Sequence, residues 1–121
     1  MKLGQLILFS GDSARLAAFY RDVLGLAVLE EEPGWVVLDA GGVKLAIHQI
    51  PKEYAGEVSS PPIKREDSYW KPTFVVDDLD AVLARLAAAG VAMSPPRTYG
   101  PRTFSDGMDV DGNVFQVARH R

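Results

Sequence analysis

The chain has no cysteine among its 121 residues, and this absence removes several kinds of site at once. Without thiolates it can form no disulfide, no cysteine-ligated zinc or iron–sulfur centre, and no cysteine nucleophile. Long apolar runs are also absent. The N-terminal run LILF stops at Ser10, Gly11 and Asp12, well short of a signal sequence or a membrane span. We therefore expect a cytoplasmic protein that does not enter a membrane.

Clusters of basic residues and histidines are lacking too. The 13 lysines and arginines are outnumbered by 16 acidic residues, which gives a net charge of -3. Nucleic acid binding depends on a basic face that neutralises phosphates, so nucleic acid is not an expected partner. The only histidines are His48 and His120, and we expect the end of the chain around His120 to fray. A metal centre of two histidines and one carboxylate is therefore disfavoured.

What the sequence does contain is a repeat, found in residues 6–26 and again in residues 73–91. Each copy has an apolar strand, an acidic capping position, an amphipathic helix and a glycine. The apolar residues of each helix recur at helical spacing and form one stripe, which predicts burial of that face. The stripes are Leu16, Phe19, Tyr20, Val23 and Leu24 in the first helix, and Leu79, Val82, Leu83, Leu86 and Ala87 in the second.

The ends of the two helices carry recognisable signals. Asp12 or Ser10 is expected to cap the first helix and Asp77 the second, because short polar side chains accept hydrogen bonds from the first free backbone amides. Gly25 and Gly90 are expected to end them.

Three strand-like runs follow each helix. They are residues 27–31, 35–40 and 43–50 in the first half, and 91–93, 102–109 and 113–119 in the second, with turn signals at 33–34, 41–42 and 111–112. Residues 51–68 are polar and contain prolines, which indicates a linker. We therefore predict an α+β fold in which one domain, 1–121, contains two βαβββ modules, 1–50 and 69–121. With a helix on only one face, the sheet is free to curve around a cavity.

Three segments make the pattern more specific: AAFYRDVLGL at 17–26, FVVDDLDAVLARLAAAGV at 74–91, and DVDGNVFQV at 109–117. With the duplicated βαβββ order they resemble the glyoxalase/bleomycin resistance/dioxygenase, or vicinal oxygen chelate, superfamily. The resemblance covers nearly the whole chain. It implies two βαβββ modules in tandem, forming a curved mixed sheet around a cavity. It also implies a homodimer whose ligand groove is built from both subunits, as in the bleomycin resistance proteins.

The resemblance also implies where a metal would sit. In metal-dependent relatives four inward-facing residues hold a divalent ion, and the matching positions here are Gln5, Ala46 or His48, Lys71 and Gln116. Neutral amides bind such ions weakly, and an ammonium repels a dication at contact range. We therefore predict no metal ligands, no cofactor and a metal-free, bleomycin-resistance-like member of the superfamily.

Strand alternation predicts which side chains face the cavity. The expected ligand-binding residues are Gln5, Ile7, Phe9, His48, Lys71, Thr73, Phe104 and Gln116. A mostly apolar cavity with a few converging polar groups is typical of a small-molecule site. The expected ligand is a small organic molecule, aromatic or anionic, and sequestering it would give antibiotic resistance.

Other interpretations stay open. One is a metal-dependent lyase, isomerase or transferase that uses an altered set such as Gln5, His48 and Asp106. Another is a cofactor-free enzyme in which His48 or Asp106 removes a proton while Lys71 stabilises the resulting charge. The purely structural alternative is that Gln5 and Gln116 bond to each other, Lys71 extends into solvent, and His48 only packs at a strand edge.

Overall fold

A computed structural model describes residues 1–55 and 62–120 of the chain. The contacts divide it into two compact units, Met1–Pro61 and Pro62–Arg121. The division falls inside the predicted linker at 51–68, of which residues 56–61 lie outside the described part. The grouping of both modules into one domain stays a prediction.

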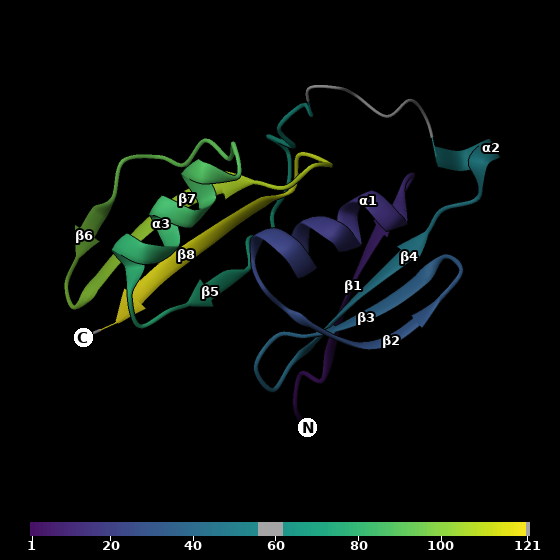
Figure 1. Cartoon of the computed structure of the whole chain (residues 1–121), viewed down its shortest axis with the longest axis horizontal. Coiled ribbons are helices and arrows are strands. Elements are labelled where there is room, and N and C mark those ends of the chain that lie inside the picture. Colours follow the sequence, from purple (N-terminus) through teal and green to yellow (C-terminus); the bar gives the residue numbers. More distant parts are fainter. Residues whose placement is uncertain (56–61, 121) are drawn as a thin grey trace. The chain divides into compact units, whose positions relative to one another are not determined.

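The first unit contains one mixed sheet and one long helical segment (Figure 1). Its elements are β1 (Gln5–Ser10), α1 (Ser13–Ala18), the π-helical turn η1 (Phe19–Val23), β2 (Ala27–Glu32), β3 (Trp35–Asp39), β4 (Lys44–Gln49) and the short α2 (Lys52–Ala55). The four strands lie in the order β1-β4-β3-β2, with β1 parallel to β4 and the other pairs antiparallel.

The second unit repeats this topology. Its elements are β5 (Thr73–Val75), α3 (Leu79–Ala88), β6 (Arg97–Tyr99), β7 (Arg102–Met108) and β8 (Val114–His120). The order is β5-β8-β7-β6, with β5 parallel to β8 and the other pairs antiparallel. The predicted α+β fold with two βαβββ modules is therefore confirmed, as two mixed four-stranded sheets.

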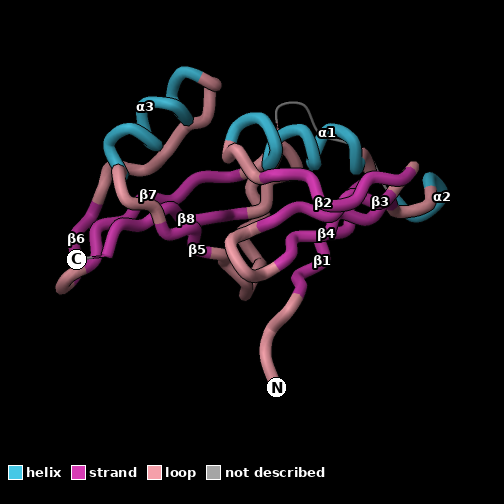
Figure 2. The backbone as a smooth tube through the Cα atoms, turned by 60° about the horizontal axis from the view of Figure 1, so that its bottom comes forward, coloured by secondary structure: helices cyan, strands magenta, loops and turns pink. Residues whose placement is uncertain are grey.

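Each sheet has a helix on one face, as the tube view shows for each unit (Figure 2). Leu16 and Tyr20 are buried in the first unit, and Leu79 and Leu86 are buried in the second. These residues belong to the two predicted apolar stripes. Under the second helix, the rings of Phe74 and Phe115 meet edge to face at 6.3 Å. We call this side of each sheet the helix-covered face and the opposite side the helix-free face.

One helix cap differs from the prediction. Asp12 caps α1 by accepting a hydrogen bond from the Arg15 amide at 3.1 Å, as expected. In α3, however, Asp78 and not Asp77 is the cap, because its carboxylate accepts from the Ala81 amide at 3.0 Å. The helix begins at Leu79, and a cap must directly precede the first helical residue.

The second module also places its second strand later than predicted. Residues 91–93 form no strand; the Val91 amide instead donates to the Leu86 carbonyl at 2.9 Å and completes the end of α3. Pro95 and Pro96 follow, and proline lacks the amide that a sheet needs. The strand therefore starts at Arg97, which pairs with Phe104.

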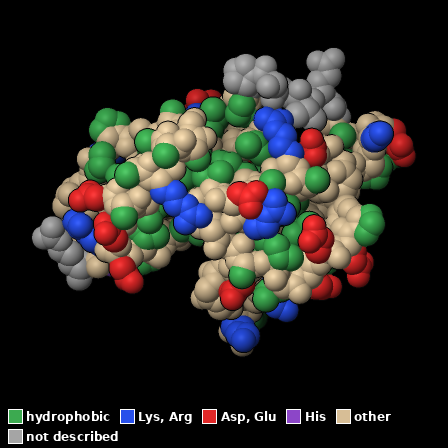
Figure 3. Space-filling view, in the orientation of Figure 1, with side chains coloured by type: hydrophobic (Ala, Val, Ile, Leu, Met, Phe, Trp, Pro, Cys, Tyr) green, Lys and Arg blue, Asp and Glu red, His purple; other side chains and the backbone are tan. Residues whose placement is uncertain are grey.

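No helix in the described residues is long and apolar enough to cross a membrane. On the face seen in Figure 3, acidic and basic side chains are interspersed.

Candidate functional site

The helix-free face of the first sheet carries three rows of side chains across the strands. The register pairs Gln5 with Lys44, Ile7 with Ala46 and Phe9 with His48, and β3 continues these rows with Asp39, Val37 and Trp35. Gln5, Ile7 and Phe9 alternate with the less exposed Leu6 and Leu8 along β1. Gln5, Ile7, Phe9 and His48 therefore share one face of this sheet, and ligand binding by this face stays a prediction.

His48 lies between two aromatic rings on this face. Its ring centroid is 5.7 Å from that of Phe9 and 5.6 Å from that of Trp35, and the contact with Trp35 is edge to face. Within residues 1–55 and 62–120 no hydrogen bond or ion pair to its imidazole is found, so none of these residues fixes its tautomer. A catalytic role for His48 stays a hypothesis.

The helix-free face of the second sheet carries a hydrogen-bonded row instead. The register aligns Thr73 on β5, Gln116 on β8 and Asp106 on β7. The Thr73 hydroxyl donates to the Gln116 carbonyl oxygen at 3.0 Å, and the Gln116 amide donates to Asp106 Oδ1 at 3.0 Å. Gln116 is buried at 7% exposure, so both ends of its amide are satisfied where water is largely excluded.

Two cations meet the other oxygen of the same carboxylate. Lys71 Nζ is 3.2 Å and Arg97 Nη2 is 3.3 Å from Asp106 Oδ2. The Asp106 side chain is 22% exposed, whereas those of Lys71 and Arg97 are 43% and 61% exposed. Asp106 is thus held from the sheet side by an amide and from the solvent side by two charges.

Phe104 supports this cluster from the adjacent row of the sheet. The guanidinium carbon of Arg97 lies 5.1 Å from the Phe104 ring centroid, and that of Arg102 lies 5.5 Å from it. Both are within the range of a cation–π contact. Only Arg97 also reaches Asp106.

Two hollows adjoin the cluster within the second unit. One, of about 560 Å³, has Arg97, Asp106 and Ser94 in its wall beside apolar residues; the other, of about 350 Å³, contains Lys71, Tyr69 and Trp70. Lys64 and Val114 line both. The larger volume is within the usual range for small-molecule sites, roughly 300–1,000 Å³.

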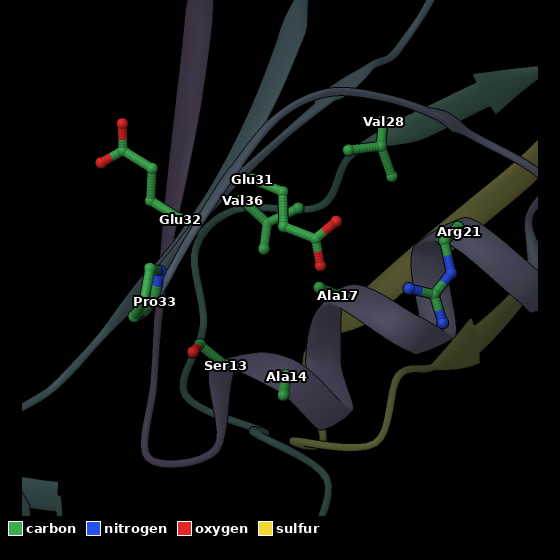
Figure 4. A pocket seen from close by; sticks show the side chains of 10 residues that line it. Ser13, Ala14, Ala17, Arg21, Val28, Glu31, Glu32, Pro33 and Val36 are labelled. Atoms are coloured by element: carbon green, nitrogen blue, oxygen red, sulfur yellow. The ribbon is translucent and has the colours of Figure 1, made fainter.

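A third hollow lies on the helix-covered face of the first unit, between α1 and β2 (Figure 4). Its volume is about 540 Å³, and Arg21 and Glu31 project into it. Arg21 bonds Asp22 through its Nε at 2.7 Å, which raises the pKa of Arg21 and lowers that of Asp22. None of the residues predicted to bind the ligand lines this hollow.

The residues at the expected metal positions fit a divalent ion poorly. Lys71 brings a positive charge, and the Gln116 amide is already bonded to Thr73 and Asp106. The carboxylate that contacts both of them, Asp106, is bonded to two cations and an amide. Within the described residues no group of three or more His, Cys, Asp or Glu side chains is suited to hold a metal.

The structure thus places the predicted site residues in two groups. The first unit holds Gln5, Ile7, Phe9 and His48, and the second holds Lys71, Thr73, Phe104 and Gln116. The suggested bond between Gln5 and Gln116 would span the two units and stays a prediction.

Sequence reasoning missed Arg97 and did not predict the ion pair between Asp106 and Lys71. A signal was present for Asp106, which lies two residues after Phe104 and therefore on the same face of β7. No such signal was present for Arg97, because the strand that contains it, Arg97–Tyr99, was predicted at residues 91–93.

Residues 2–117 match the family described as Glyoxalase/Bleomycin resistance protein/Dioxygenase superfamily. Among curated proteins no match to this sequence was found.

Many solved structures share the fold. TnmS3, an antibiotic binding protein from Streptomyces sp. CB03234, is 21% identical over 100% of this chain and 97% of its own, with a TM-score of 0.73. A lactoylglutathione lyase from Agrobacterium tumefaciens is 22% identical over 98% of this chain and 92% of its own, with a TM-score of 0.72. The fosfomycin resistance protein FosX from Listeria monocytogenes is 17% identical over 100% and 94%, with a TM-score of 0.76.

Proposed function

Because the chain belongs to the glyoxalase/bleomycin resistance/dioxygenase superfamily, we propose that it binds a small organic molecule and that this binding requires no metal. The superfamily includes both binding proteins and enzymes, so the fold alone does not choose between them. The choice depends on the side chains at the site.

The observation that carries the proposal is the bonding of Asp106. Lys71, Arg97 and Gln116 all donate to this carboxylate. A carboxylate with these partners is a poor ligand for a dication, since two positive charges already lie within 3.3 Å of it. It is also poorly placed to act as a general base, because both of its oxygens already accept hydrogen bonds from protein side chains. This bonding disfavours both enzymatic interpretations that use Asp106.

Two comparisons support a binding role. TnmS3 is described as an antibiotic binding protein and FosX as a fosfomycin resistance protein. At 21% and 17% identity they share the fold with this chain, and sequestration of an antibiotic is the function we propose by analogy. We also propose the homodimer that the resemblance implies, with a ligand groove formed from both subunits.

Metal analysis and ligand binding together test the proposal. We expect protein purified without chelators to contain nickel, zinc, manganese and iron only far below one ion per chain. Isothermal titration against a panel of small aromatic and anionic compounds is expected to find a ligand, and treatment with EDTA is expected to leave its affinity unchanged. A stoichiometric metal, or a panel with no binder at all, would overturn the proposal.

A further inference from the structure

The cluster around Asp106 has an excess of positive charge. Lys71 and Arg97 both contact Asp106 Oδ2, so two cations share one negative charge. Both side chains remain well exposed, at 43% and 61%, whereas the carboxylate between them is 22% exposed. The cations therefore keep a side open to solvent on which a second anion can bind.

The walls of the two hollows beside the cluster also carry more positive than negative side chains. Their walls contain four cationic side chains and two carboxylates: Lys64, Arg65, Lys71 and Arg97 against Glu66 and Asp106. The chain as a whole carries a net charge of -3. A locally positive site on an acidic protein favours anions over neutral molecules at that site.

The guanidinium of Arg97 is also held in position before any ligand arrives. It lies 5.1 Å from the Phe104 ring centroid and bonds Asp106 Oδ2 at 3.3 Å. Asp106 is in turn bonded to Gln116, which is buried at 7% exposure and bonded to Thr73. A donor that is already ordered loses less conformational entropy on binding.

The remaining wall of the larger hollow is suited to an apolar ligand body. Its apolar and small residues are Ala92, Pro95, Gly107, Met108 and Val114. At about 560 Å³ it is large enough for a compact organic molecule.

We infer that the ligand is an organic anion, whose carboxylate or similar acidic group binds Lys71 and Arg97 beside Asp106 while its apolar body occupies the hollow lined by Met108 and Val114. This inference rests on the proposed binding function and specifies the class of ligand for the same site. Asp106 acts as an internal counter-ion that keeps the two cations in place and competes with the ligand for them.

A matched pair of probes tests this charge requirement. 2-Naphthoate and 2-naphthamide have the same ring system and differ in charge, and titration calorimetry gives the affinity of each. We expect the naphthoate to bind at least about tenfold more tightly, because hydrogen bonds to charged groups are stronger than those between neutral groups. The preference should also decrease as salt concentration rises.

Two arginines on the same aromatic ring provide a matched control. Arg97→Gln should abolish most of the preference for the naphthoate. Arg102→Gln should retain it, because Arg102 contacts Phe104 but not Asp106. Asp106→Asn should strengthen naphthoate binding, because it removes the competing negative charge. Circular dichroism of each variant checks that the fold is retained.

Equal affinity for the two probes, or a preference that survives Arg97→Gln combined with Lys71→Gln, would overturn the inference. So would binding of neither probe. In each of these cases the proposed function still stands if a neutral or cationic compound from the wider panel binds without metal, so the two failures are distinguishable.

Discussion

At the scale of single residues, the site depends on whether position 116 is an amide or a carboxylate. The Gln116 amide donates to Asp106 Oδ1 at 3.0 Å, in a setting where Gln116 is 7% exposed. Gln116→Glu replaces this donor with an oxygen that repels the carboxylate. We expect a loss of roughly 1–3 kcal/mol in the free energy of unfolding at neutral pH, measured by urea denaturation.

The pH dependence of that loss separates repulsion from poor packing. At acid pH one of the two carboxyl groups takes up a proton and can donate to the other, so the deficit of Gln116→Glu should shrink. Gln116→Met is the control, because it removes the hydrogen bond without adding charge. A deficit of the glutamate variant that does not change with pH would contradict this account.

A second residue-scale prediction concerns Asp22, where the hydrogen bond from Arg21 lowers the carboxyl pKa below its ordinary value of 3.8. The pair's contribution to stability is therefore present above the ordinary pKa and lost as the pH falls through the lowered one. In Arg21→Gln we expect the Asp22 pKa to return towards 3.8. Carboxyl carbon NMR titration measures the shift, and an unchanged Asp22 pKa would contradict the assignment.

Gln116 and Asp106 show which features of single residues can be predicted from the sequence and which cannot. The orientation of Gln116 followed from strand alternation alone, since Val114, Gln116 and Ala118 share one face of β8. Its bonding did not follow, because Asp106 meets it only through the pairing of β7 with β8. Cross-strand partners depend on the register between strands, which alternation within a single strand does not determine.

At the scale of elements, the start of α3 gives a direct test of the corrected cap. Asp78 accepts from the Ala81 amide, whereas Asp77 precedes the cap and is exposed. Asp78→Ala should cost about 0.5–2 kcal/mol in the free energy of unfolding. Asp77→Ala is the matched control and should cost much less. A larger effect of the Asp77 variant would restore the original prediction.

The turn before β8 offers a second test. Gly112 has a φ of +82°, and a Cβ there would overlap the carbonyl of Ile63. Gly41 has a similar φ of +79°, but open space lies around its Cβ position. Both alanine variants strain the backbone, and only Gly112→Ala adds a collision.

We therefore expect Gly41→Ala to lower the unfolding free energy by about 1 kcal/mol and Gly112→Ala to lower it by clearly more. Thermal and urea denaturation of the two variants give the difference. Equal losses would mean that the segment around Ile63 moves away without cost.

Element prediction from sequence succeeded where periodic patterns and glycines coincide. Both helices, their final glycines and the strands of the first unit follow from such signals. The prediction failed at β6, because Val91 satisfies the end of α3 and the strand starts only after Pro96. An apolar run that follows a helix can either complete the helix end or begin a strand, and the local sequence pattern is the same in both cases.

At the scale of the whole molecule, the two sheets leave apolar side chains on their helix-free faces. Ile7 is 44% exposed and Phe9 60% exposed in the first unit, and Val75 is 60% exposed in the second. Apolar surface marks sites that bind ligands or other protein chains where it forms a large contiguous patch, and Ile7 and Phe9 lie two residues apart on the same face of β1. The repeat itself could be predicted from the sequence, because each copy carries the same order of signals. Whether a ligand or another chain covers these faces could not be predicted, since association depends on surface shape that no local pattern encodes.

The proposed homodimer can be tested by the mass of the protein in solution. Sedimentation equilibrium at micromolar concentration should give twice the chain mass of 13.2 kDa. If the helix-free face of β1 contributes to the interface, Phe9→Glu should shift the equilibrium towards the monomer, because it places a charge on an apolar contact. Leu29→Glu is the control, since Leu29 is similarly exposed, at 53% against 60% for Phe9, but lies at the bulge of the edge strand β2. A wild-type protein that remains monomeric at these concentrations would contradict the dimer, and would require the ligand site to be complete within one chain.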